Sequence, residues 1–126
     1  MTPTTAGRPE GAEVRQLEPG IHVAGNRDVD DPSSTKVREI HGAVKAIDLA
    51  APFGEVVRGL VDVLSAHPHT GQPVENACVH TPEYGTRSAS VIALGPQRRG
   101  YWATDGAPCK AKFQDCTRLL DEIQLV

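Results

Sequence analysis

The polar residues that follow a short apolar run near the N-terminus have side chains of types found in binding and catalytic sites. His22 lies within the run Ile21–Ala24, and Asn26 and Asp28 follow it. A scaffold often presents functional groups where the chain leaves a strand, and a side-chain amide such as that of Asn26 can donate to a developing oxyanion. Alternatively, Asn26 and Asp28 satisfy turn backbone and cap the next helix. We therefore treat His22, Asn26 and Asp28 as candidate ligand-binding residues.

A second polar segment, Tyr84–Ser90, has an arginine among small hydroxyl residues. The guanidinium of Arg87 has a fixed fork of donors that suits a carboxylate or a phosphate. In a strand, Thr86 and Ser88 would share one face and Arg87 would lie on the other. We expect Tyr84, Thr86, Arg87 and Ser88 to contribute to a ligand site. The alternative is that Arg87 pairs with a structural acid such as Asp28, with no ligand involved.

The cysteines and histidines were compared with the spacing of metal sites. Cys78 and His80 are two residues apart and would share a strand face, and Cys109 with Cys116 could complete four ligands. Six residues separate Cys109 from Cys116, no CxxC motif is present, and Cys116 falls on an apolar stripe. We therefore expect no metal site. Cys78 and Cys116 are interpreted as core residues, Cys109 as an exposed thiol, and the histidines of segment 67–69 as solvated.

The elements that must position these residues follow from apolar periodicity. Three- and four-residue steps predict a helix that begins at Pro32 with Asp31 as N-cap, and a second, wider stripe predicts a helix from Phe53 to Leu64. Apolar positions between Phe113 and Ile123 predict a closing helix. Short β-branched runs predict strands at 14–17, 21–24, 77–80, 86–94 and 101–104. This order predicts an α+β fold with a mostly antiparallel sheet packed with helices.

Composition limits the classes of function. The chain of 126 residues has room for one domain, which we place at 13–126 after a disordered tail at 1–12. Its 13 basic and 16 acidic residues give a net charge of −3, and only 4% of residues are aromatic, which argues against nucleic-acid binding. No apolar run is long enough to span a membrane. Three cysteines, an odd number, favour a reducing cytoplasm.

The two polar segments also resemble the NRDE family, that of transport and Golgi organisation protein 2. The first likeness is to the middle of the family's sequences, and the second is to a YGTRSS-type strand further along. It is carried by Leu17–His22, Asn26, Asp30–Pro32, Lys36–Val37 and Tyr84–Ser90. The likeness runs from about Glu13 to the end and corresponds to the C-terminal half of a typical member.

The resemblance implies a fold similar to N-terminal-nucleophile hydrolases, in which two stacked antiparallel sheets lie between helical layers. By similarity to related choloylglycine-hydrolase-like enzymes, Asn26 would match the oxyanion-hole amide. Arg87 would match the arginine that orients the nucleophile and the substrate. Family members usually begin Met-Cys and use that cysteine, whereas this sequence has no cysteine near its start. Thr2, which removal of Met1 would expose, is not expected to take its place, because no predicted strand holds it.

Three functions follow as expectations. The first is a non-enzymatic cytoplasmic protein that binds or transfers a small hydrophobic carboxylate such as haem or an acyl lipid, in keeping with the family's association with haem mobilisation and lipid homeostasis. The second is the C-terminal half of a cysteine-dependent amidohydrolase, inactive without its N-terminal half. The third is a small structural or interaction domain. Because the resemblance covers half a stacked-sheet domain, we expect one apolar sheet face to lack a partner within the chain and to be covered by a second copy or another protein.

Overall fold

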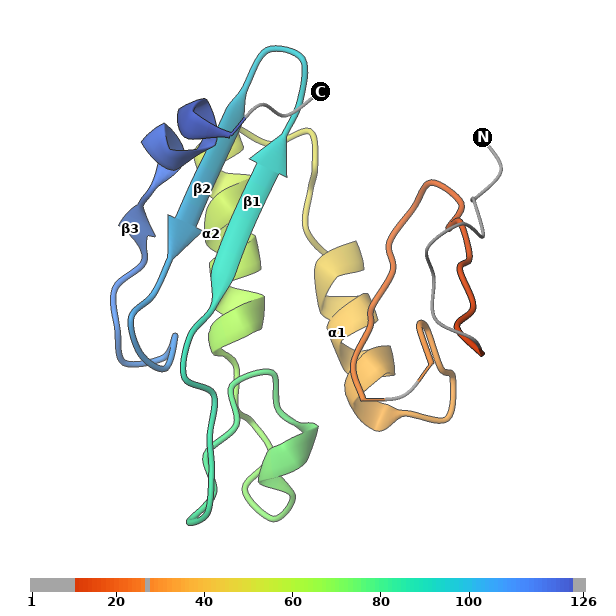
Figure 1. Cartoon of the computed structure of the whole chain (residues 1–126). Helices are drawn as coiled ribbons and strands as arrows, with labels where there is room; N and C mark the ends of the chain where they lie inside the picture. The colour runs from red at the N-terminus through yellow and green to blue at the C-terminus, as the bar shows by residue number, and fades with distance from the viewer. Residues whose placement is uncertain (1–10, 27, 124–126) are drawn as a thin grey trace.

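The computed structural model describes residues 11–26 and 28–123, and these form a helical layer against a small sheet (Figure 1). In chain order the elements are α1 (Thr35–Lys45), α2 (Phe53–Ser65), the 3-10 helix η1 (Pro73–Glu75), β1 (Ser90–Leu94), β2 (Arg99–Ala103), β3 (Gln114–Asp115) and the 3-10 helix η2 (Thr117–Glu122). The strands of the described part pair in the order β1-β2-β3, and both pairings are antiparallel. This confirms the expected α+β class with a mostly antiparallel sheet.

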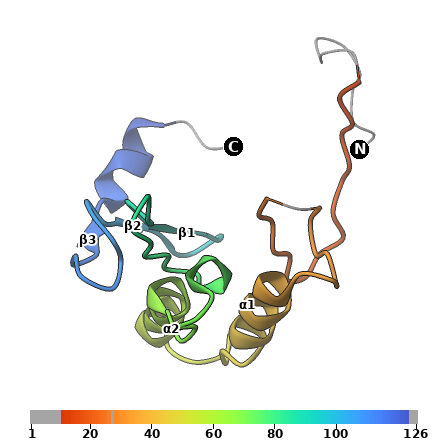
Figure 2. The same ribbon diagram turned by 90° about the horizontal axis from the view of Figure 1, so that it is seen from below.

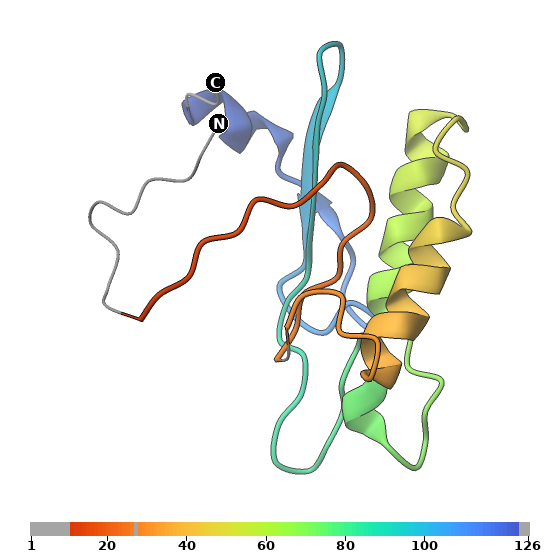
Figure 3. The same cartoon turned by 90° about the vertical axis from the view of Figure 1, so that its right-hand side faces the viewer.

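The two faces of the sheet have different neighbours. Helices α1 and α2 lie on one side, and η2 lies on the other (Figures 2 and 3). On the helical side, the indole of Trp102 packs against Phe53 of α2 with ring centroids 5.8 Å apart, and Val91 is buried. On the opposite side, Ile92 and Leu94 are 56% and 61% exposed. On the face opposite the helices, β1 therefore has apolar side chains that the described residues leave mostly exposed.

The two helices begin and end close to where their apolar stripes predict. Helix α2 matches its predicted start and extends one residue further, and Pro52 precedes its first turn. The predicted start of α1 was wrong, because Ser34 and not Asp31 is the N-cap: its hydroxyl accepts from the N–H of Val37 at 3.2 Å. The Asp31 carboxylate instead accepts from the N–H and hydroxyl of Ser33, one turn earlier. The chain from 31 to 34 is consequently a turn, and the helix starts at Thr35.

The predicted strands at 14–17 and 21–24 are absent, since no neighbouring strand is there to pair with them. Asp30 fixes the conformation of segment 21–24 instead. Its N–H donates to the carbonyl of Val23 at 2.8 Å, and its carboxylate accepts from the N–H of Val23 at 2.7 Å. Asp30 has a φ of 57°, in the left-handed region, which aspartate tolerates better than most residues. The segment is therefore a closed loop and not a strand.

The remaining strand predictions were correct only in part. Segment 77–80 forms a single bridge, between His80 and Gly85. The strand predicted from Thr86 begins only at Ser90, because Thr86 bonds back to Val79 through its N–H and its hydroxyl. The closing α-helix is replaced by β3 and η2, because the N–H of Cys116 donates to the carbonyl of Tyr101 and fixes that segment along β2.

The core is small. Its buried apolar side chains come from α1, from the segment before β1, from β1 and from η2: Val37, Cys78, Val79, Val91 and Leu120. Cys78 has no exposed surface, whereas the other four keep 4–8% of theirs. No helix of the described part is long and apolar enough to cross a bilayer. The predicted tail at 1–12 lies outside the described residues except for its last two, as does Thr2.

Candidate functional site

His22 is used to hold its own loop together. Its Nδ1 lies 2.6 Å from a carboxylate oxygen of Asp30, and its Nε2 lies 2.5 Å from the carbonyl oxygen of Glu18. Both partners accept hydrogen bonds, so the doubly protonated ring satisfies both. The bond to Asp30, and then that to Glu18, raise the pKa of His22. The bond from His22 and the N–H of Val23 lower the pKa of Asp30. His22 therefore stabilises the conformation of its own loop.

Asn26 lines a surface pocket of about 340 Å³ between this loop, α1 and η1. Most of its wall is apolar and comes from Val23, Ala24, Val37, Ile40 and Val74, and its polar side chains are Asn26, Ser34, Lys36 and Glu75. The carboxylate of Glu75 accepts from the backbone N–H of Lys36 at 3.1 Å and joins η1 to the first turn of α1. Asp28 does not line this pocket: its side chain is exposed, and its carbonyl accepts from the N–H of Asp31.

The second predicted segment lies elsewhere. Tyr84 is 59% exposed, and its carbonyl accepts from the N–H and hydroxyl of Thr81. The hydroxyl of Thr86 accepts from the N–H of Val79. Arg87 and Ser88 are exposed, and among the described residues the guanidinium of Arg87 has no hydrogen bond or ion pair. Figure 1 shows segment 82–88 at the bottom of the molecule, on the opposite side of η1 from the 20–30 loop.

The structure therefore does not bring Asn26 and Arg87 together. Four well-formed surface pockets of the described part contain no residue of segment 84–88, and one of them is lined by Asn26. An arrangement in which the amide of Asn26 and the guanidinium of Arg87 face one substrate needs both to line a common cavity. Arg87 also forms no ion pair with Asp28 in the described part of the chain, so the structural alternative for Arg87 is not seen either.

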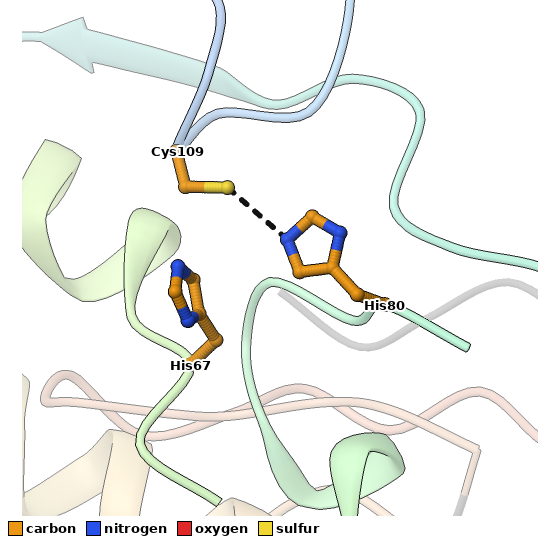
Figure 4. A group of neighbouring side chains, drawn as sticks. All are labelled: His67, His80 and Cys109. Carbon is orange, nitrogen blue, oxygen red and sulfur yellow. Dashed lines mark hydrogen bonds between the residues drawn. The ribbon is translucent and has the colours of Figure 1, made fainter. Parts of the chain in front are cut away.

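A group of sulfur and imidazole side chains gathers at the end of α2. One ligand atom each of His67, His80 and Cys109 lies within 4.8 Å of the other two (Figure 4). The Nε2 of His80 is 3.1 Å from the Sγ of Cys109 and 3.4 Å from the Sγ of Cys78. The rings of His67 and His80 meet edge to face with centroids 5.3 Å apart. We call these four residues the Cys–His cluster.

The backbone around the Cys–His cluster is held by specific hydrogen bonds. The N–H of Cys78 donates to the carbonyl of Ala66, the C-cap of α2, at 3.0 Å. The hydroxyl of Ser65 donates to the carbonyl of Pro108 at 3.2 Å and fixes the residue before Cys109. Burial raises the pKa of the Cys78 thiol. Three chain segments, distant in sequence, are thus fixed around the cluster.

Asn76 holds the histidine-containing loop 67–69. Its side chain is almost fully buried, accepts from the N–H of His69 at 2.8 Å and donates to the carbonyl of His69 at 3.0 Å. The ring of His69 contacts another element: its Nε2 lies 2.6 Å from the carboxylate of Glu39 on α1. Of the two histidines in this loop, His67 alone joins the cluster.

The sequence analysis weighed Cys78, His80, Cys109 and Cys116 as a set of four ligands, expected no metal site, and interpreted Cys116 as a core residue and His67 as solvated. In the structure, the Sγ of Cys116 faces the carbonyl of Gln114 at 3.6 Å, at the other edge of the sheet. His67 reaches the cluster because the chain turns directly after α2 and returns through Cys78. The available signal was the pair His67–His69 directly after a helix end, near a Cys-x-His pair.

Comparison of the chain with models of protein families, with curated proteins and with solved structures finds no match.

Proposed function

We propose that this chain is an NRDE-family-like protein that binds a small molecule with an apolar body and an anionic group in the pocket lined by Asn26. The observation that carries the proposal is the composition of that pocket's wall. Its volume of about 340 Å³ and its mostly apolar lining with a few polar groups are typical of small-ligand sites. The resemblance of the two polar segments to the NRDE family supports the same class of ligand.

The polar groups of the pocket favour an anionic end group. The backbone N–H at the first turn of α1 already has the Glu75 carboxylate as its acceptor, whereas the ammonium of Lys36 has no ion pair among the described residues. Lys36 can therefore attract a carboxylate, and the amide of Asn26 can donate to the same group. The neighbouring charge of Glu75 opposes a ligand with more than one negative charge.

The volume of the pocket favours an acyl chain over a haem. A ligand gains most of its affinity from burial of apolar surface, and a short acyl chain fits along the wall formed by Val37, Ile40 and Val74. A tetrapyrrole is larger than this pocket and would leave much of its ring in solvent. Arg87 lies outside the pocket, so we assign the role of carboxylate partner, expected of Arg87, to Lys36.

Calorimetric titration of the full chain with sodium octanoate and with octanol tests this proposal. We expect octanoate to bind more tightly than octanol. Replacing Lys36 by glutamine should weaken octanoate about tenfold, because a hydrogen bond to a charged group is worth about 1.5 kcal/mol. Octanol affinity should stay unchanged.

Lys45→Gln, at the other end of α1, is the matched control and should leave both affinities intact. Haem, followed by its absorbance, forms a third titration and should not compete with octanoate for the pocket. No saturable binding of octanoate, or equal octanoate affinity in Lys36→Gln and wild type, would overturn the proposal.

A further inference from the structure

We propose that the Cys–His cluster is a zinc site in which His67, His80, Cys109 and Cys78 are the four ligands. This site is separate from the Asn26 pocket. Figure 4 shows three of them: His67 from the segment after α2, His80 from the segment before β1 and Cys109 from the turn that precedes β3. Cys78, two residues before His80, is the fourth, and its Sγ lies 3.4 Å from the Nε2 of His80. Two imidazoles and two thiols form the Cys₂His₂ set that structural zinc sites use.

The distances from the Nε2 of His80 to the two sulfur atoms are close to those between ligands of one small ion. Zinc binds sulfur at about 2.3 Å and imidazole nitrogen at about 2.0–2.1 Å in tetrahedral geometry, which places sulfur and nitrogen ligands about 3.5 Å apart. The Nε2 of His80 lies 3.1 Å and 3.4 Å from the two sulfur atoms. Since the ligand atoms of His67, His80 and Cys109 lie within 4.8 Å of one another, rotations of these side chains and of Cys78 would bring all four around the ion.

The chemistry of the ligands selects the kind of metal. Thiolate and imidazole favour zinc and other soft or borderline ions, whereas magnesium and calcium prefer oxygen. No carboxylate belongs to the cluster among the described residues. Binding removes the proton from each thiol, so each bound sulfur carries a negative charge that offsets the charge of the ion.

The surroundings suit a site with one buried, fixed ligand and two ligands exposed to solvent. Cys78 has no exposure, and the N–H of Cys78 is bonded to the end of α2, so the inner ligand is fixed. His67 and His80 are exposed, so the ion reaches the site directly from solvent. An ion bound to all four would cross-link three segments that are distant in sequence, and its binding energy would add to the stability of the fold.

Titration of the full chain with cobalt(II) alone, after removal of metals by a chelator and with a phosphine reductant that keeps thiols reduced, tests the proposal. We expect one equivalent to produce the visible bands of tetrahedral cobalt and a near-ultraviolet thiolate-to-cobalt band. One equivalent of zinc should abolish both. Cys109→Ser and His67→Gln should each weaken binding about 100-fold or more. Loss of a group that only hydrogen-bonds to a metal ligand already costs about 10–100-fold in affinity.

Matched controls separate this site from adventitious binding. Cys116→Ser removes a thiol outside the cluster, and His69→Gln removes the neighbouring histidine, whose ring pairs with Glu39. Both should bind cobalt as the wild type does. Circular dichroism of each variant before titration shows whether it folds. Lack of a tetrahedral spectrum in the wild type, or the same affinity in Cys109→Ser and His67→Gln as in the wild type, would overturn the proposal.

Discussion

Replacing Asn76 by alanine should destabilise the chain more than any exposed substitution. The Asn76 side chain is 3% exposed, and it makes one hydrogen bond to the N–H and one to the carbonyl of His69, at 2.8 Å and 3.0 Å. Alanine removes both bonds and leaves two backbone groups of a part-buried loop without these partners. Each bond is worth about 1–1.5 kcal/mol, so the free energy of unfolding should fall by about 2–3 kcal/mol.

Urea unfolding followed by the fluorescence of the single tryptophan, Trp102, measures this loss. The slope of the transition should be unchanged, and the midpoint should fall by roughly 1–2 M, since small domains lose about 1–3 kcal/mol per molar urea. Asn26→Ala removes an exposed amide and serves as control. Because the same loop positions His67, Asn76→Ala should also weaken zinc binding about 10–100-fold. A loss below about 0.5 kcal/mol, the range of ordinary surface substitutions, would refute this reasoning.

Three further predictions concern pH, packing and metal. The raised pKa of His22 and the lowered pKa of Asp30 stabilise the loop fully between pH 3.8 and 6.5. That stability is lost as pH rises through the native pKa of His22 or falls through that of Asp30. The melting-temperature difference between wild type and His22→Gln should therefore be largest inside this window and should vanish well above it. Gly100→Ala should cost about 1–3 kcal/mol in urea unfolding, because an added Cβ overlaps the Trp102 indole that packs on Phe53; no loss would show that the indole is free to move. Zinc at 100 times its dissociation constant should stabilise the chain by about 2.7 kcal/mol and raise the melting temperature by about 5–15 °C, and an unchanged melting temperature would contradict binding to the folded state.

The sequence was sufficient for elements whose pattern is local and strong. The wide stripe from Phe53 to Leu64 defines α2 to within one residue, since helix hydrogen bonds lie within the segment. Segment 21–24 has a strand-like pattern too, yet it forms no strand. A strand needs a partner, and the carboxylate of Asp30, several residues later, supplies the acceptor that a neighbouring strand would have supplied.

The candidate sites were predictable only where spacing fixes geometry. Cys78 and His80 lie two residues apart, and the structure places their side chains together as that spacing predicts. The membership of His67 depends on the turn after α2 and on the bond from Cys78 to Ala66, which no periodicity encodes. Cys116 was considered as a fourth ligand only because it completes the count, and its segment is fixed along β2 by the bond from its N–H to the carbonyl of Tyr101.

X-ray absorption at the zinc edge of the metal-loaded full chain measures the ligands of the Cys–His cluster most directly. The account predicts two sulfur atoms at about 2.3 Å and two nitrogen atoms at about 2.0–2.1 Å, with the sulfur count reduced to one in Cys109→Ser. A zinc shell made of oxygen and nitrogen without sulfur would contradict the assignment of Cys78 and Cys109 as ligands.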